Sequence, residues 1–278
     1  MLYLILAIIC STLISVIMRL SSHRVSSRLN MLAVNYLTCL GLGIVSAGFA
    51  NVFPAHESTN TTLLMGIGNG ILYLSSFILM QNSIKKYGVV LPSTFMKLGL
   101  LVPMVFSILV FGEMPTWMQL VGFVLAVFAI VLINSEPGQS AAGIKPDLIL
   151  LLIIGGAGDA MSKVFEETGA PQLSSQFLLY TFGAAFLLCC VLMLLRKEKL
   201  QGSAVLFGLL IGIPNYYSAK FLLQSLSDIP AVIAYPTYSV ATILAITLVG
   251  IVFFKEKLSR RQWISLSIIL AALILLNI

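Results

Sequence analysis

Long runs of apolar residues dominate this chain, and short polar stretches separate them. A helix rises 1.5 Å per residue, so about twenty apolar residues cross the ~30 Å hydrocarbon core of a bilayer. Backbone groups that face lipid must be hydrogen-bonded within their own segment, which favours helices. The pattern predicts ten membrane-spanning helices, near residues 2–18, 31–52, 62–83, 88–111, 117–134, 147–164, 173–195, 203–226, 230–254 and 261–277.

Composition supports a membrane location. Only 9% of the 278 residues are charged and 59% are hydrophobic, whereas about a quarter of the residues in a soluble domain are charged. The net charge of +6 comes from basic clusters between apolar runs, which indicates anchoring at the membrane surface and no nucleic-acid partner. The four cysteines lie in apolar runs without metal-ligand spacing, so we expect neither a metal site nor a cofactor. The first run lacks a basic leader region, so we expect a mature helix there and not a signal peptide.

The second half of the sequence repeats the first. "FGEMPTWMQLVGFVLAVFAIVLIN" (111–134) and "FKEKLSRRQWISLSIILAALILLN" (254–277) share F-x-E-x-x-[T/S]-x-x-Q before an apolar run that ends in Asn. Gly66-x3-Gly70 likewise resembles Gly208-x3-Gly212, and such spacing lets membrane helices pack closely. We predict two five-helix repeats, residues 1–134 and 147–278, joined by a loop at 135–146.

The basic residues predict how the two repeats are oriented. Thirteen of the sixteen Lys and Arg residues lie in or beside the connections after spans 1, 3, 5, 7 and 9. Because each repeat has an odd number of helices, this bias is reversed between the repeats, as in an inverted repeat. The positive-inside rule then places these connections in the cytoplasm and both termini outside.

These features resemble the drug/metabolite transporter superfamily, in particular its ten-helix branch with two EamA-type domains. The likeness rests on the duplicated "GEMPTWMQLVG" and "KEKLSRRQWIS" segments, on the ten spans, and on "KYGVVLPSTF" and "LSDIPAVIAYPTY" at the start of spans 4 and 9. The resemblance implies an all-α integral membrane protein in which helices 1–4 and 6–9 surround a central cavity. It also implies alternating access between two halves, and it says little about substrate.

Polar residues inside the spans are the candidates for substrate binding. Lys97 lies about nine residues into span 4, where a lysine costs roughly 2.5–3.5 kcal/mol. We interpret it as a substrate-binding lysine, with pairing to a backbone carbonyl or a distant acid as the alternative. Lys220 and Tyr216 are four residues apart and share a helix face, although Lys220 is close enough to the span end to reach the interface. The remaining candidates are Asn215, which follows an expected helix break at Pro214, and Tyr235, Tyr238, Tyr73 and Thr94.

Asp159 and Lys163 are the candidates for ion coupling. They stand four residues apart in "GGAGDAMSK", so an intrahelical ion pair is one interpretation. The alternative is that Asp159, the one carboxylate placed within a predicted span, carries a proton. Glu113 and Glu256 begin two helical hairpins, and we interpret them as capping or loop residues.

The sequence therefore predicts a secondary active transporter of a small polar metabolite in the cytoplasmic (inner) membrane, coupled to protons or another ion, and monomeric or homodimeric. Cationic candidates outnumber acidic ones in the spans, which favours an anionic or zwitterionic substrate such as an amino acid or organic acid. The alternatives are a cationic drug exporter, although span 1 has no acid, and a lipid-headgroup flippase. An intramembrane enzyme is not expected, because both histidines lie in loops and a Ser93–Lys97 dyad is only a weak hint.

Overall fold

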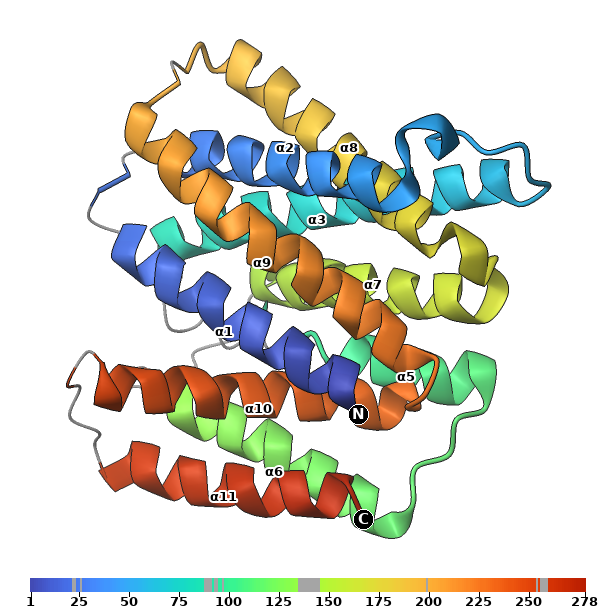
Figure 1. The fold of residues 1–278 in the computed structure, drawn as a ribbon. Coiled ribbons are helices and arrows are strands. Elements are labelled where there is room, and N and C mark those ends of the chain that lie inside the picture. Colours follow the sequence, from blue (N-terminus) through green and yellow to red (C-terminus); the bar gives the residue numbers. More distant parts are fainter. Residues whose placement is uncertain are drawn as a thin grey trace. The chain divides into compact units, whose positions relative to one another are not determined.

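The computed structural model describes residues 1–21, 24–25, 27–87, 92, 95–96, 98–134, 146–198, 200–253, 255 and 260–278. Within these residues the chain forms ten α-helices, two short 3-10 turns and no strand (Figure 1). Seven of the described helices are long and apolar enough to cross a membrane. The helices are α1 (Leu2–Ser21), α2 (Arg28–Ala47), α3 (Thr59–Tyr87), α5 (Leu101–Phe111), α6 (Trp117–Asn134), α7 (Pro146–Thr168), α8 (Ser174–Leu195), α9 (Gly202–Leu226), α10 (Ala231–Val252) and α11 (Arg260–Leu276).

The predicted all-α membrane architecture is confirmed, and the helices follow the predicted spans closely. The second span ends earlier than expected, because Gly48 adopts φ +85° and its N–H bonds the carbonyl of Ile44, which closes α2. The fourth predicted span is described only in part, since residues 88–91, 93–94 and 97 lie outside the described residues. Its described helix, α5, begins after a turn at Gly99 and Leu100.

The helices group into two compact units, and each unit takes helices from both sequence repeats. Unit 1 comprises residues 1–74 and 164–227, and unit 2 comprises residues 75–163 and 228–278. The chain therefore passes from one unit to the other within α3, within α7 and between α9 and α10. The compact units thus differ from the sequence repeats, whose boundaries stay a prediction.

Close packing through glycine organises unit 1. There α9 lies along α1 and α2, and α2 also packs on α8. A methyl group added at Gly212 of α9 would lie 2.4 Å from Cβ of Thr38 on α2, and one at Gly66 of α3 would lie 2.6 Å from Cβ of Tyr180 on α8. Both glycine pairs therefore allow close helix contacts, as their spacing predicts.

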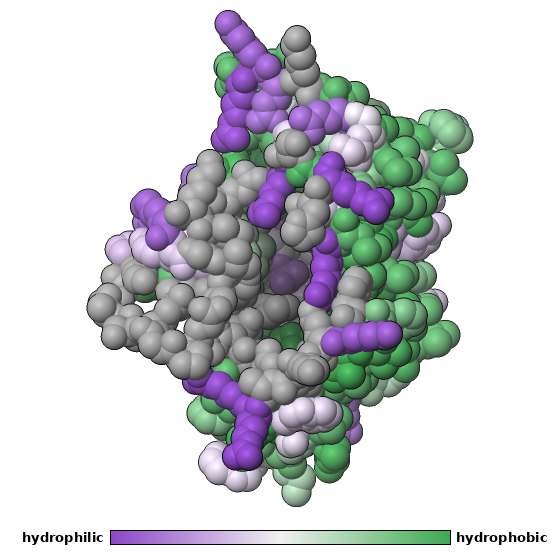
Figure 2. Space-filling view, turned by 90° about the vertical axis from the view of Figure 1, so that its left-hand side faces the viewer, coloured by the Kyte–Doolittle hydropathy of each residue, from purple (hydrophilic) through white to green (hydrophobic). Residues whose placement is uncertain are grey.

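Unit 2 has a continuous apolar core. Its α11 lies along α6, and α10 contacts α5, α6 and α11 (Figure 1). Phe123, Ile130, Val240 and Ile269 are among the buried side chains of this core. Exposed positions elsewhere in the described chain are also often apolar, and Figure 2 shows hydrophobic side chains covering one flank of the view. Such a surface is expected where the solvent is lipid.

Candidate functional site

Glu113 in unit 2 is placed by the sharp end of α5. The helix ends at Gly112, whose φ of +69° is the left-handed conformation that glycine adopts without strain. The N–H of Glu113 then bonds the carbonyl of Ser107 at 3.2 Å. This hydrogen bond reaches back to the residue six positions earlier and satisfies a carbonyl group at the helix end. The chain then turns at once toward α6.

The carboxylate of Glu113 joins two other helices of unit 2. One oxygen lies 2.9 Å from Nζ of Lys163 on α7, and the other accepts the N–H of Val232 at 3.1 Å. Val232 is in the first turn of α10, where amide groups have no partner within the helix. Glu113 is therefore both the counter-ion of a buried lysine and the cap of a helix distant in sequence. The Lys163 side chain is only 3% exposed, and its ammonium lies 5.8 Å from the Phe111 ring centroid.

The rest of the duplicated segment serves the start of α6. The Thr116 N–H bonds the side-chain oxygen of Gln119 at 2.9 Å, and the Gln119 N–H bonds the Thr116 hydroxyl at 3.3 Å. This reciprocal pair is a capping box. The pattern F-x-E-x-x-[T/S]-x-x-Q thus combines a ring beside Lys163, its counter-ion and a helix cap. The second copy of the pattern lies largely outside the described residues.

Asp159 lies one turn before Lys163 on α7. Its backbone carbonyl accepts a 2.6 Å hydrogen bond from the Tyr235 hydroxyl of α10. The Asp159 carboxylate is half-buried and forms no hydrogen bond or ion pair with any residue that the structure describes. Just before it, Gly156 packs so closely on the turn at Gly99 that an added methyl group would lie 2.2 Å from the Gly99 carbonyl oxygen. Asp159 is thus held on a closely packed helix while its carboxylate is left without a partner among the described residues.

Lys220 in unit 1 has neutral neighbours. Its ammonium donates to the Ser46 hydroxyl on α2 at 3.2 Å and lies 5.9 Å from the ring centroid of Tyr216. The second contact confirms that Lys220 and Tyr216 share a face of α9. No carboxylate of the described chain pairs with Lys220. The described partners of this half-buried ammonium are thus a hydroxyl and an aromatic face, both without charge.

Asn215, five residues before Lys220 on α9, belongs to a small polar cluster with α2. Its side-chain amide donates to the Asn35 oxygen at 3.2 Å and approaches the sulfur of Cys39 at 3.8 Å. The Cys39 thiol in turn donates to the carbonyl of Gly212 at 3.3 Å. These contacts hold amide groups inside the membrane-spanning region without any charge, next to the glycine contact described above.

Aromatic rings connect the other unit 1 candidates. Tyr73 packs edge-on against Phe182 with centroids 6.0 Å apart, and buried Tyr216 lies 6.1 Å from the same ring. Tyr217 packs edge-on against Tyr216 at 5.5 Å. Tyr73 and Tyr216 therefore both pack against Phe182, and Lys220 contacts this group through the Tyr216 ring.

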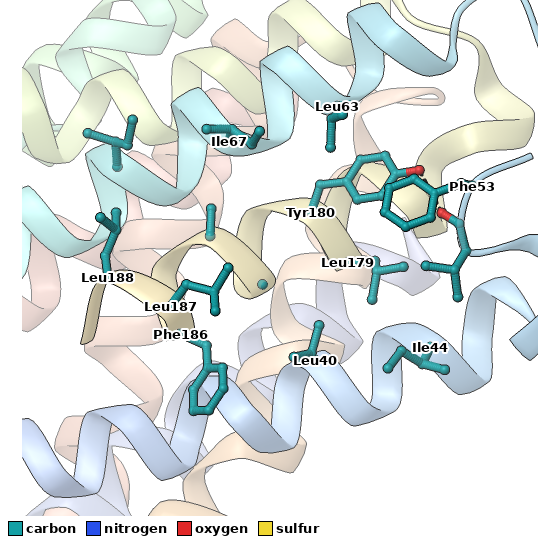
Figure 3. A pocket seen from close by; sticks show the side chains of 14 residues that line it. Leu40, Ile44, Phe53, Leu63, Ile67, Leu179, Tyr180, Phe186, Leu187 and Leu188 are labelled. Atoms are coloured by element: carbon teal, nitrogen blue, oxygen red, sulfur yellow. Dashed lines mark hydrogen bonds between the residues drawn. The ribbon is translucent and has the colours of Figure 1, made fainter. Parts of the chain in front are cut away.

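Unit 1 also contains an apolar groove of about 520 Å³. Leu40 and Ile44 of α2 line one side and Leu63 and Ile67 of α3 the other, while the stacked rings of Phe53 and Tyr180 close one end (Figure 3). The lining offers almost no polar group to a ligand. This groove therefore does not provide recognition for a polar substrate.

Known proteins resemble both halves of the chain. The EamA-like transporter family matches residues 1–135, and the Small Multidrug Resistance protein family matches residues 176–269. An uncharacterized protein of Haemophilus influenzae is 25% identical over 282 residues, which cover 97% of this chain and 95% of that protein. One crystal structure of a protein superposes with a TM-score of 0.75 at 15% identity, covering 99% of this chain and 94% of the other, and so shares the fold.

The two matches together indicate a membrane transporter of the drug/metabolite type. The transporter is a multi-pass membrane protein, and the families that it matches are transporters and not enzymes. The first half matches the EamA-like model as expected from the resemblance, whereas the second half matches the Small Multidrug Resistance model.

The structure places most of the predicted site residues of the transporter in two groups. Lys220, Tyr216, Asn215 and Tyr73 lie in unit 1, and Asp159, Lys163, Tyr235 and half-buried Tyr238 lie in unit 2. Lys97 and Thr94 lie outside the described residues. Whether these residues bind substrate stays a prediction.

Two expectations need correction. The helix break expected at Pro214 is wrong, because α9 continues through it from Gly202 to Leu226, as membrane helices can when neighbouring groups satisfy the freed carbonyl. The ion pair of Lys163 is formed with Glu113 and not with Asp159. Glu113 was expected only to cap or to lie in a loop, and its presence in the duplicated pattern was the available signal for a larger role.

Proposed function

We propose that the transporter is a secondary active carrier in the cytoplasmic membrane, which moves a small polar metabolite with an anionic or zwitterionic character by alternating access. The observation that carries this proposal is the environment of Lys220, whose described partners are a hydroxyl and an aromatic ring. A cation in a membrane span costs free energy, and that cost is offset when a carboxylate or phosphate of a substrate binds it. The adjacent Asn215 amide and Tyr216 ring supply neutral contacts for the rest of a small ligand.

We further propose that Asp159 couples transport to protons. Its carboxylate is half-buried and without a described partner, so protonation does not have to break an existing ion pair. A carboxylate that alternates between neutral and charged states in a low-dielectric region is a common proton carrier in membrane transporters. Tyr235 holds the Asp159 backbone from α10, which fixes the carrier relative to that helix.

Uptake into proteoliposomes tests this proposal. Labelled succinate, leucine and tetraphenylphosphonium are offered to the purified protein under an imposed pH gradient. We expect accumulation of succinate or leucine, a loss of about tenfold or more in Lys220→Met because a charge-assisted hydrogen bond contributes about 1.5–3 kcal/mol, and loss of gradient dependence in Asp159→Asn. Lys86→Met, which removes an exposed lysine, is the matched control. Unchanged succinate and leucine uptake in Lys220→Met would contradict the assignment.

Export of cationic drugs is the second candidate, because the Small Multidrug Resistance model matches residues 176–269. Those exporters use a glutamate within their first helix, as the family resemblance implies, and neither α1 nor α8, the first helix of the matched region, has an acidic residue. Asp159 would then have to bind the cation. Uptake of tetraphenylphosphonium that survives in Lys220→Met and is lost in Asp159→Asn would favour this candidate.

A further inference from the structure

We propose that Glu113 is a positioning residue for coupling: by occupying Lys163, it keeps the carboxylate of Asp159 without a cation and therefore able to exchange a proton. This inference rests on the coupling role proposed for Asp159. It concerns residues of unit 2 alone.

The first step is a competition for Lys163. Asp159 and Lys163 are four residues apart on α7, the spacing at which a carboxylate and an ammonium on one helix face ordinarily pair. The ammonium instead lies 2.9 Å from the Glu113 carboxylate. Glu113 reaches it from the connection between α5 and α6, so tertiary structure has replaced the local partner with a distant one.

The second step is that Glu113 is itself held in place. Gly112 turns the chain at the end of α5, and the second carboxylate oxygen of Glu113 accepts the N–H of Val232 at 3.1 Å. Its negative charge at the N-terminal end of α10 is favourable for the helix dipole. The Phe111 ring, 5.8 Å from the ammonium, adds a neutral contact to Lys163. These contacts direct Lys163 toward Glu113.

The third step is the consequence for Asp159. A cation within a few ångströms favours the ionised form of a carboxylate. If Lys163 were released, it could turn to Asp159 and hold it ionised over the working pH range, so that protonation would require a more acidic solution. Among the described residues, the charged and titratable groups that contacts place around this part of α7 are Lys163 on the same helix, Tyr235 on α10 and Glu113 from the α5–α6 connection.

Two substitutions separate positioning from simple stability. Glu113→Gln removes the negative charge but keeps an oxygen that can accept the Val232 N–H, so it releases the ammonium with the cap retained. Lys163→Gln breaks the same ion pair but leaves no ammonium to capture Asp159. A purely structural role predicts similar behaviour of both variants, whereas positioning predicts that only Glu113→Gln changes the titration of Asp159.

Infrared difference spectroscopy of the protein in lipid vesicles measures this titration without any substrate. The protonated-carboxyl band that disappears in Asp159→Asn is assigned to Asp159, and its midpoint is followed with pH. We expect a midpoint shift of about one to three pH units toward acid in Glu113→Gln, and none toward acid in Lys163→Gln. Repeating the titrations in a Lys97→Met background tests whether Lys97 also affects the titration midpoint of Asp159.

The outcomes distinguish the inference from the function on which it rests. An unshifted midpoint in Glu113→Gln, or an equal acid shift in Lys163→Gln, overturns the positioning role. A gradient dependence of uptake that persists in Asp159→Asn overturns the proposed coupling role instead. If Glu113→Gln does not fold, Glu113→Asp keeps the charge but shortens its reach, and a smaller acid shift is expected there. No shift in that variant would also overturn the inference.

Discussion

Lys163 in unit 2 and Lys220 in unit 1 are two lysines in membrane-spanning helices with opposite surroundings. Lys163 is almost fully buried and faces a carboxylate that also caps α10. Lys220 is half-buried and contacts a serine hydroxyl and a tyrosine ring. Since desolvating a charge is costly in either place, the partner decides what each lysine can do. A buried lysine with a counter-ion contributes to structure, whereas the ligand-binding role proposed for Lys220 depends on its neutral partners.

The difference extends to the two units. In unit 1 a neutral cluster joins α2 to α9. It consists of the amides of Asn35 and Asn215 and the thiol of Cys39, beside helices in close contact at glycine. In unit 2, the end of α5, the start of α10 and Lys163 of α7 meet at one ion pair. We therefore expect unit 2 to be sensitive to loss of charge, and the α2–α9 contact of unit 1 to be sensitive to added volume.

Breaking the buried ion pair has the largest expected effect. Lys163→Met leaves the Glu113 carboxylate without its counter-ion in a desolvated position, and removal of one partner of a buried pair costs about 3–5 kcal/mol. The free energy of unfolding in mixed detergent micelles measures this loss. The double variant Glu113→Met, Lys163→Met removes both charges and is expected to recover much of it, apart from the lost α10 cap.

The exposed ion pair of unit 2 is the matched control for this prediction. Lys86 and Asp147 are 2.5 Å apart, with side chains 60% and 39% exposed, and the hydrogen bond to Asp147 raises the pKa of Lys86. Exposed pairs are screened by solvent, so Lys86→Met should leave the unfolding free energy nearly unchanged. Equal losses from Lys86→Met and Lys163→Met would show that burial does not distinguish the two pairs.

Adding volume at a helix contact of unit 1 comes next. Gly212→Ala places a methyl group 2.4 Å from Cβ of Thr38, and overpacking of this kind costs typically about 1–3 kcal/mol. Gly41→Ala is the control on α2, because a methyl group there has no neighbour within 4 Å. Thermal unfolding in detergent should show a lower midpoint for Gly212→Ala alone. Equal midpoints would mean that α2 and α9 are not in close contact at this position.

Sequence patterns predict the helices well, because lipid leaves the backbone few alternatives. They also predict the glycine contacts and the shared face of Tyr216 and Lys220, since both follow from helical periodicity. The partner of Lys163 could not be predicted in this way. Local spacing favours Asp159 as the partner. The actual partner, Glu113, pairs with Lys163 through a contact between segments fifty residues apart in the sequence. The capping box at Thr116 and Gln119 was not predicted, although its spacing is that of a known helix-start signature.

The boundaries of the two compact units are equally hard to predict from the sequence repeat. The repeated sequence predicts two similar sets of five helices, but α3 and α7 each pass from one unit to the other within a single helix. In α3 the residues on both sides of the crossing are largely apolar, so no composition change marks it. The Asn35–Asn215 contact was missed for a related reason: an isolated amide in an apolar run does not reveal its partner.

Removing the lysine of unit 1 should affect stability much less than removing that of unit 2. Lys220→Met loses a hydrogen bond to Ser46 and a contact with the Tyr216 ring, but it leaves no acid unpaired among the described residues. The lost contacts and the relief of desolvation oppose each other, so we expect a change within about 1 kcal/mol. The same micelle unfolding assay compares it with Lys163→Met. A loss as large as that of Lys163→Met would mean that Lys220 is a structural lysine.

The smallest expected effect is the coupling between Asn35 and Asn215. Their 3.2 Å hydrogen bond joins α2 to α9, yet hydrogen bonds between membrane helices average only about 0.6 kcal/mol, because the unfolded chain in lipid also finds partners. A double-mutant cycle with Asn35→Leu and Asn215→Leu isolates this energy from the effects of each substitution alone. A second cycle that combines Cys39→Ala with Asn215→Leu measures the contribution of the Cys39 sulfur, which contacts the same amide. A coupling several times larger would make the neutral network of unit 1 as important to stability as the ion pair of unit 2, and the contrast between the two units would then lie in their chemistry and not in their strength.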